Sequence, residues 1–181
     1  MITFAKIYPL KLISLSRIGY TLVLSSLLLL SACTHIDLFE KTVAVPGHAW
    51  KSDFSPSFSF TIKDSTPQRI FLILRHDEKY DFNNIIVNLD IKSDKADSAD
   101  HQSFDLPLTA ADKGWTGTGM DDIYEHRISL INTHAPGKGE SILDWYLNPG
   151  TYTFTLKQNM REDPLQHVYN VGIRVEKPNV K

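Results

Sequence analysis

Residues whose types could do chemistry gather in the stretch DKGWTGTGMDD, at residues 112–122. Three glycines surround Trp115 here, and two aspartates, Asp121 and Asp122, follow them. A glycine loop holds phosphate when it follows a strand and opens a helix, because free amide N–H groups at the helix start bind the anion. GWTGTG matches neither of the usual glycine-loop spacings, and no helical pattern follows it. We therefore predict a turn, in which glycine supplies a positive φ.

The acidic residues that end this stretch and the two residues that follow it closely are the nearest approach to a set of metal ligands: Asp121, Asp122, Glu125 and His126. Calcium loops alternate oxygen ligands around a required glycine, and zinc sites take His or Cys at defined spacings. Neither pattern is present, so we predict no metal site and interpret these residues as a solvated turn and strand edge.

A second polar group, His76, Asp77 and Glu78, follows an apolar strand pattern and is expected in a loop. The chain has no G-x-S-x-G motif, no H-E-x-x-H motif and no cysteine placed as a nucleophile. No catalytic residue is predicted, and the chain is not expected to be an enzyme.

The N-terminus has the layout of an export signal. Lys6, Lys11 and Arg17 precede an apolar run from Ile18 to Leu30, and no acidic residue occurs before Asp37. The run is about 13 residues, which is short of the roughly 20 that a permanent membrane-spanning helix needs. This layout predicts a signal peptide over residues 1–32.

The run ends at LSAC, which resembles the bacterial lipobox and places the only cysteine, Cys33, after small residues. The resemblance implies cleavage between Ala32 and Cys33, and a diacylglycerol and an N-linked fatty acyl chain, such as palmitate, on Cys33. The alternative is an ordinary signal peptide with a chance cysteine. Several acyl chains would anchor the protein stably without a transmembrane helix. Thr34 replaces the aspartate that retains enterobacterial lipoproteins in the inner membrane, so the outer membrane is expected.

Removal of the signal peptide leaves an acidic chain of ordinary domain size. The segment takes away three of the 19 basic residues and none of the 21 acidic ones, which leaves a net charge of −5. That balance argues against nucleic-acid binding. Residues 33–47 mix apolar and polar positions without a clear period and are expected to be an extended tether, and one domain is expected over 48–181.

Period-2 alternation of apolar and polar residues recurs along the domain, and no long amphipathic helix is evident. Together with turn-forming residues between the segments, this predicts an all-β antiparallel sandwich, either jelly-roll or immunoglobulin-like. The predicted strands are 57–62, 69–75, 85–91, 124–131, 151–158 and 168–176, with a further strand near 104–108 and an exposed polar loop over 93–102.

In order along the chain, the domain looks like the GldH family of gliding-motility lipoproteins from Bacteroidota. The resemblance rests on Trp50 before the first strand, on FLILRHDEKYDFNNIIVNLDI, on GWTGTG and on NPGTYTFTLKQNMREDPLQHVYNVGIRVE. It implies a non-enzymatic accessory or assembly component of the gliding-motility machinery and the linked secretion machinery, with no cofactor beyond the lipid. Its partners would be other cell-envelope proteins.

Two strand-end loops, at 75–84 and 159–167, are the expected partner-binding surface, because they combine arginine, acidic residues and bulky apolar groups. Arg75 and Arg161 could instead only fix these loops, by pairing with Asp77 or Asp163. Exposed tryptophan rings would favour a second function, glycan binding by a surface lipoprotein. The candidate partner-binding residues are Arg75, Tyr80, Asn84, Trp115, Met160 and Arg161.

Overall fold

The protein is described by a computed structural model, which places residues 38–132 and 142–178. These described residues form one compact unit. The predicted signal peptide and the lipobox cysteine Cys33 lie outside the described residues.

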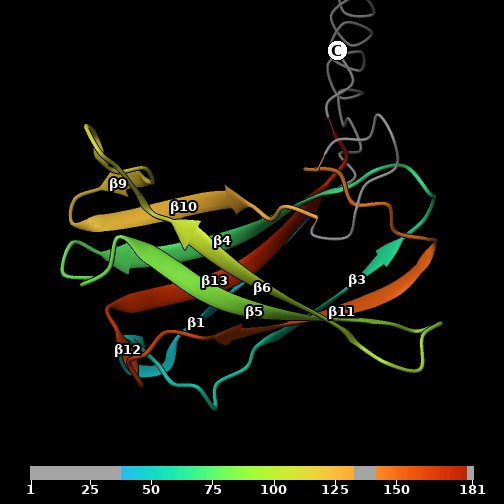
Figure 1. Cartoon of the computed structure of the whole chain (residues 1–181), viewed down its shortest axis with the longest axis horizontal. Helices are drawn as coiled ribbons and strands as arrows, with labels where there is room; N and C mark the ends of the chain where they lie inside the picture. Colours follow the sequence, from blue (N-terminus) through green and yellow to red (C-terminus); the bar gives the residue numbers. More distant parts are fainter. Residues whose placement is uncertain (1–37, 133–141, 179–181) are drawn as a thin grey trace, which may run out of the picture. The chain divides into compact units, whose positions relative to one another are not determined.

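The unit is an antiparallel sandwich, in which one layer is a five-stranded sheet with the order β1-β13-β4-β10-β9 (Figure 1). The long strands β4, β10 and β13 form its centre, and β9 is a short edge strand. The strands are β1 (Leu38–Ala44), β4 (Arg69–Asp77), β9 (Thr118–Met120), β10 (Ile123–Ser129) and β13 (Val168–Glu176).

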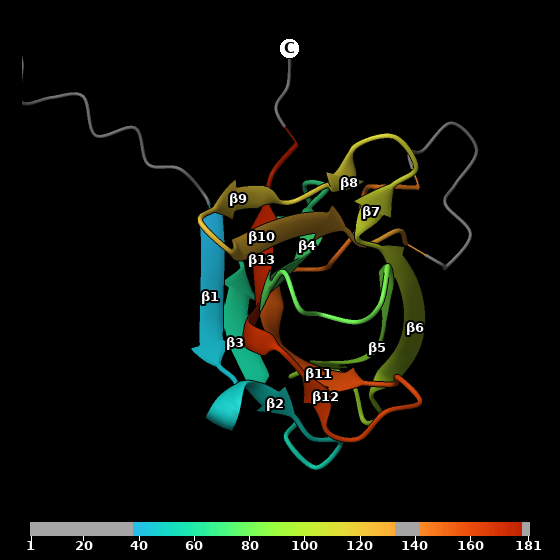
Figure 2. The same cartoon turned by 90° about the vertical axis from the view of Figure 1, so that its left-hand side faces the viewer.

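A four-stranded sheet with the order β3-β11-β5-β6 forms the other layer, and Figure 2 shows the two layers from the side. Two short two-stranded pairs, β12 with β2 and β7 with β8, close the ends. The bounds are β3 (Ser57–Ile62), β5 (Asn84–Ser93), β6 (Asp100–Pro107), β11 (Gly150–Gln158), β2 (Ala49–Trp50), β12 (Leu165–Gln166), β7 (Thr109–Ala110) and β8 (Gly114–Trp115).

The core lies between the two sheets, where alternate residues of each strand face inward. In β3, Phe58, Phe60 and Ile62 are buried while the serines and the threonine between them are exposed. Phe60 meets Phe154 of β11 edge to face, with ring centres 4.9 Å apart. This alternation is the pattern that the sequence contains, so the predicted all-β antiparallel sandwich is confirmed.

Segment 38–44 differs from the prediction. It was expected to belong to an extended tether, but it is edge strand β1 and pairs with β13 along its whole length. Its sequence gives a weak signal because five of its seven residues are exposed, so its apolar and polar positions barely alternate. The polar segment 93–102 is also shorter as a loop than expected, since β6 begins at Asp100.

The only helical segment among the described residues is a single 3-10 turn, η1 (Pro46–His48). None of the described residues forms a helix that is long and apolar enough to cross a membrane.

Candidate functional site

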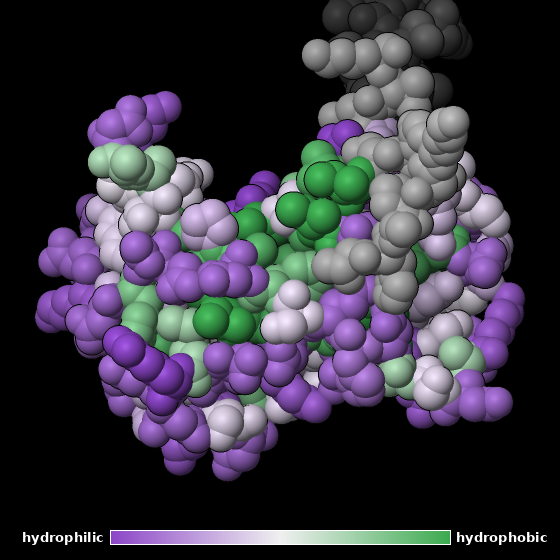
Figure 3. All heavy atoms as spheres, viewed as in Figure 1, coloured by the Kyte–Doolittle hydropathy of each residue, from purple (hydrophilic) through white to green (hydrophobic). Residues whose placement is uncertain are grey.

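A groove of about 680 Å³ runs beside β10, at the end of the sandwich where β4 ends and β10 begins. In Figure 3 the end of the molecule that carries β9 projects beside a hollow, and apolar surface lies across it. Thr116 to Thr118 and Met120 to Asp122 form one wall. The other wall is β10 from Ile123 to Ile128, except for Tyr124, together with Arg75 of β4.

The second half of the glycine-rich stretch DKGWTGTGMDD therefore lines this groove, and the glycines of the stretch have two structural roles. Gly114 has a φ of 68° and turns the chain between β7 and β8. Gly117 lets the chain approach β10, because a Cβ atom there would lie 2.8 Å from the carbonyl oxygen of Glu125 and 2.9 Å from the His126 ring. Gly119 meets the Tyr124 ring in the same way. The glycines thus shape a turn and a close strand contact.

His76 of β4 and His126 of β10 are both buried at the groove, where their nearly parallel rings meet edge to edge through the Nε2 atoms. His126 was expected at a solvated strand edge, and His76 was expected in a loop together with Asp77. Both predictions are wrong, since the two histidines are buried and β4 ends with His76 and Asp77. The Nδ1 of His76 donates to the carbonyl oxygen of Asp77 (2.6 Å), and the two Nε2 atoms are 2.9 Å apart. Only one proton fits between them, so in the neutral pair the His126 Nε2–H donates to His76.

Charging this pair is unfavourable. Burial, and after it the charge on a protonated His76, lower the pKa of His126 to about 4. Burial also lowers the pKa of His76, against the opposing effect of the Asp77 carbonyl and carboxylate. At neutral pH both imidazoles are neutral.

Asp77 connects three segments at this end of the sandwich. Its carboxylate accepts hydrogen bonds from the backbone N–H of Lys79 (2.9 Å) and from the hydroxyl of Tyr169 (3.3 Å), and it lies 3.1 Å from Nδ1 of His167. Burial alone would raise the pKa of Asp77, but these contacts outweigh it and lower the pKa. An ionised Asp77 therefore holds the β4 end against the β12–β13 segment.

Aromatic rings extend this cluster into the strand-end loops. Trp115 packs edge to face on His76, with ring centres 4.4 Å apart, and Tyr80 lies 5.0 Å from His76. Phe82 follows Tyr80 at 5.8 Å, and the guanidinium of Arg161 lies 5.9 Å from the Phe82 ring. The predicted loops 75–84 and 159–167 thus meet at one end of the molecule.

Three of the predicted partner-binding residues have structural roles in these loops, and a fourth, Arg161, is exposed. The Tyr80 hydroxyl donates to the carbonyl oxygen of Asn84 (3.0 Å), and the Asn84 amide donates to Asp105 (2.6 Å). Met160 accepts the backbone N–H of Ile86 at its sulfur (3.1 Å). Tyr80 is buried, whereas Arg161 is exposed beside Phe82.

Arg75, the fifth, lies on the outer face of the five-stranded sheet and pairs with Glu125, not with Asp77. Asp163, the alternative partner of Arg161, instead accepts a hydrogen bond from the backbone N–H of Ser52 (2.9 Å). The two expected loop-fixing ion pairs are therefore replaced by other contacts. Trp115, the sixth, is half-buried within the aromatic cluster.

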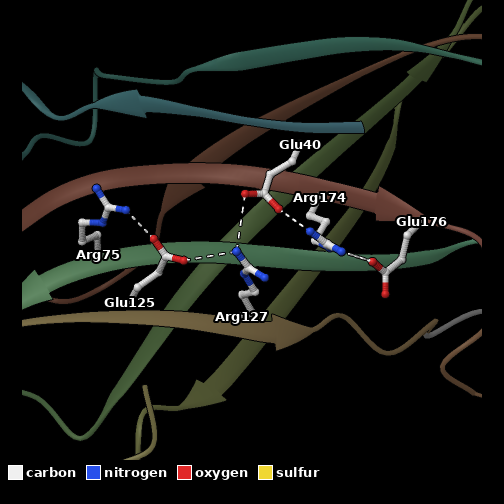
Figure 4. Close-up of polar contacts among 6 residues, drawn as sticks. All are labelled: Glu40, Arg75, Glu125, Arg127, Arg174 and Glu176. Atoms are coloured by element: carbon white, nitrogen blue, oxygen red, sulfur yellow. Dashed lines mark hydrogen bonds and ion pairs between the residues drawn. The ribbon is translucent and has the colours of Figure 1, made fainter. Parts of the chain in front are cut away.

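Arg75 begins a row of alternating charges across the outer face of the sheet (Figure 4). Glu125 contacts Arg75 and, at 3.5 Å, Arg127; Arg127 lies 3.7 Å from Glu40. Glu40 then accepts from Arg174 (2.6 Å), which also binds Glu176. Arg127 has the longest contacts of the three arginines, and half of its side chain is exposed.

Sequence reasoning missed two features of this site. One is the pairing of His76 with His126, which are 50 residues apart. The other is the edge of β10 at Arg127 and Ile128, which becomes visible only when the lengths of β9 and β10 are known. The period-2 pattern placed β10, but it carries no signal for the length of the neighbouring strand.

No cluster of three or more possible metal ligands occurs among residues 38–132 and 142–178. The buried polar side chains of His76, His126 and Asp77 have hydrogen-bond partners within the protein. The groove beside them can therefore serve as a surface for contact with another molecule.

The profile of the GldH lipoprotein family matches residues 37–175. The chain belongs to the GldH lipoprotein family. This match covers both sheets and all the residues of the groove, and the family is not a known family of enzymes. None of the curated proteins compared with the chain matches it.

Among solved structures, the chain is similar to a carbohydrate-binding module described as specific for non-crystalline cellulose, with 8% identity and a TM-score of 0.42 over 74% of this chain and 69% of that one. It is also similar to the VP2 subviral particle of infectious bursal disease virus (9% identity, TM-score 0.32, 80% of this chain and 33% of that one). A structure of the Gx strain of that virus gives 15% identity and a TM-score of 0.28, over 77% of this chain and 30% of that one. The chain thus spans about a third of the viral proteins.

Proposed function

We propose that this chain is a lipid-anchored accessory component of the bacterial gliding-motility machinery and of the protein-secretion machinery linked to it. The observation that carries the proposal is the family match over residues 37–175. The lipobox resemblance at LSAC supports an acylated Cys33 as the anchor, and Thr34 supports the outer membrane as its location.

The described domain is consistent with a protein-binding role. Its polar clusters are bound internally, while arginine and aromatic side chains converge from separate loops at one end. Arginine and aromatic residues are enriched at the centres of protein interfaces. We propose cell-envelope proteins as the partners of this end.

The three tryptophans do not favour glycan binding. Trp50 and Trp145 are buried, and their ring N–H groups donate to the carbonyl oxygens of Phe54 and Leu130. Trp115 is half-buried against His76. Stacking of a sugar needs an exposed ring face, so the tryptophans do not support glycan binding.

Deletion and complementation in the native organism test the proposal. A strain without this chain should lose surface spreading and release less secreted protein, and the wild-type gene should restore both. A Cys33→Ser gene, which removes the proposed anchor, should restore neither. A deletion strain that spreads and secretes normally would refute the proposed function.

A further inference from the structure

Strand β10 is longer than the edge strand beside it. The three residues of β9 pair with Ile123, Tyr124 and Glu125 only, while β10 continues to Ser129. Beyond Glu125, no described strand pairs with β10 on the side away from β4. Arg127 and Ile128 of this part line the groove, and Arg127 to Ser129 are called the free edge below.

The register shows which backbone groups face outward. The N–H of Leu130 donates to the carbonyl oxygen of Ile70 (2.8 Å), so even-numbered residues of β10 direct their backbone groups to β4. The N–H and C=O of Arg127 and Ser129 therefore point away from β4. No backbone hydrogen bond from another described residue reaches them.

One further polar group at this edge is unsatisfied. The side-chain hydroxyl of Ser129 is buried and has no hydrogen-bond partner within the described parts of the chain. Buried polar groups in native proteins nearly always have a partner, so such groups point to a missing ligand or neighbour.

The side chains around the free edge differ between its two faces. On the outer face stands Arg127, whose contacts to Glu125 and Glu40 are 3.5 and 3.7 Å long. A guanidinium has five N–H donors, so Arg127 keeps donors for another carboxylate. On the inner face stands half-buried Ile128, and Met120, whose side chain is 79% exposed, lies in the opposite wall.

We propose that the free edge of β10 binds an extended polypeptide segment of a partner protein as an added β-strand. An acidic residue of that segment pairs with Arg127, and an adjacent apolar residue packs on Ile128. Only a polypeptide backbone presents donors and acceptors at the spacing of the unpaired groups on Arg127 and Ser129. Binding of a strand at this edge does not depend on the proposed role in motility.

The test uses the full chain, purified from membranes in mild detergent, and a blocked peptide of about eight residues in which glutamate and valine alternate, long enough to cover one strand. Saturable binding, measured by fluorescence anisotropy, is expected. The same peptide with alternate amide nitrogens methylated loses its ladder hydrogen bonds and should bind at least about tenfold more weakly. Equal binding of the methylated peptide would overturn the proposal, and so would the absence of saturable binding.

A proline substitution tests the strand edge from the protein side. Ser129→Pro removes an N–H that points away from β4 and leaves the bonds to β4, so it should weaken peptide binding about tenfold. Ser59→Pro is the matched control: Leu156 N–H donates to Pro56 O (3.0 Å), so the N–H of Ser59 likewise faces the open edge of β3. Equal loss in both variants would contradict the proposal.

A charge exchange gives an answer even if Ser129→Pro fails to fold. A peptide with lysine in place of glutamate should bind wild-type chain weakly and Arg127→Glu chain well, since the charge pair is restored in reverse. Wild-type chain that forms dimers, which Ser129→Pro dissociates, would assign the edge to a second copy and overturn the partner-peptide proposal.

Discussion

Burial sets the chemistry of His76 and His126. The two Nε2 atoms, 2.9 Å apart, can share one proton, and a second would bring two imidazolium N–H groups into contact. The neutral His76 ring packs against Trp115, Tyr80 and Tyr124. The histidine pair therefore holds β4 to β10 at the base of the groove. Its contribution to stability depends on remaining neutral.

Protonation of this pair should make the fold sensitive to acid. The unfolded chain binds the proton at the ordinary histidine pKa of 6.5, while the folded chain binds it at about 4 for His126. The unfolded state therefore binds more protons between these values, so stability is complete above pH 6.5 and falls as pH drops toward 4, by about 3 kcal/mol. Thermal melting between pH 7 and pH 4 measures this.

Two variants separate the pair from other acid effects. His126→Gln cannot titrate and should melt with a flatter pH dependence than wild type. His101→Gln removes an exposed histidine of β6 that pairs with Asp90 (2.6 Å), far from the buried pair in the other sheet, and should keep the loss of stability that the buried pair causes. An unchanged slope in His126→Gln would contradict the role of the buried pair.

Arg75 and Arg161 should matter for association more than for folding. Arg75 pairs with Glu125 at an exposed position, and Arg161 stacks on Phe82, contacts that contribute roughly 0 to 1 kcal/mol each. Arg75→Ala and Arg161→Ala should therefore melt close to wild type but lose envelope partners in co-purification. A large drop in melting temperature with association retained would assign both residues a structural role.

Edge strand β1 depends on one glycine of its neighbour. A Cβ atom at Gly172 would overlap the carbonyl oxygen of Lys41 and come within 2.8 Å of the Thr42 Cα. Gly172→Ala should thus push β1 off β13 and cost about 1 to 3 kcal/mol. Hydrogen exchange should quicken selectively at β1 amides.

The matched control for Gly172 is Gly150→Ala, whose new Cβ would meet only the side chains of Asp94 and Lys95, which can move. It should leave exchange at β1 unchanged. If Gly172→Ala also leaves β1 protected and the melting temperature unaltered, the close packing of β1 on β13 is not a constraint.

At the level of elements, the sequence predicts strands whose faces differ. SFSFTI and TYTFTLKQ alternate strictly, and β3 and β11 lie where this pattern predicts them. Strand β1 was missed because its burial barely alternates, with five of its seven residues exposed. The free edge of β10 was missed for another reason: it follows from the difference in length between β9 and β10, which no local pattern encodes.

At the level of the whole molecule, the sequence predicts that the two loops lie at strand ends, but it does not predict which residues of the two loops touch. Their actual contacts, such as Arg161 on Phe82 and His167 near Asp77, join residues about 80 to 90 positions apart, where spacing along the chain carries no signal. The sequence predicted membership of the GldH lipoprotein family, and the profile match over 37–175 confirms it.

Anchoring should depend on Cys33 alone, since it is the only cysteine and the apolar run before it is too short to span a bilayer. Cys33→Ser should abolish acylation and leave the protein uncleaved or mislocalised. Mass spectrometry of the N-terminal peptide and fractionation of membranes measure both effects. A Cys33→Ser protein that still partitions as a mature lipoprotein would contradict the assignment.

Co-purification of the full chain from membranes of the native organism tests the central claim most directly, that this lipoprotein is a component of an envelope machine. Wild-type chain, crosslinked in cells and identified with its neighbours by mass spectrometry, should carry motility or secretion proteins of the envelope. The Arg75→Ala, Arg161→Ala double variant should reach the membrane in equal amount without them. A wild-type chain that brings down no such protein, or a double variant that retains them all, would contradict the account.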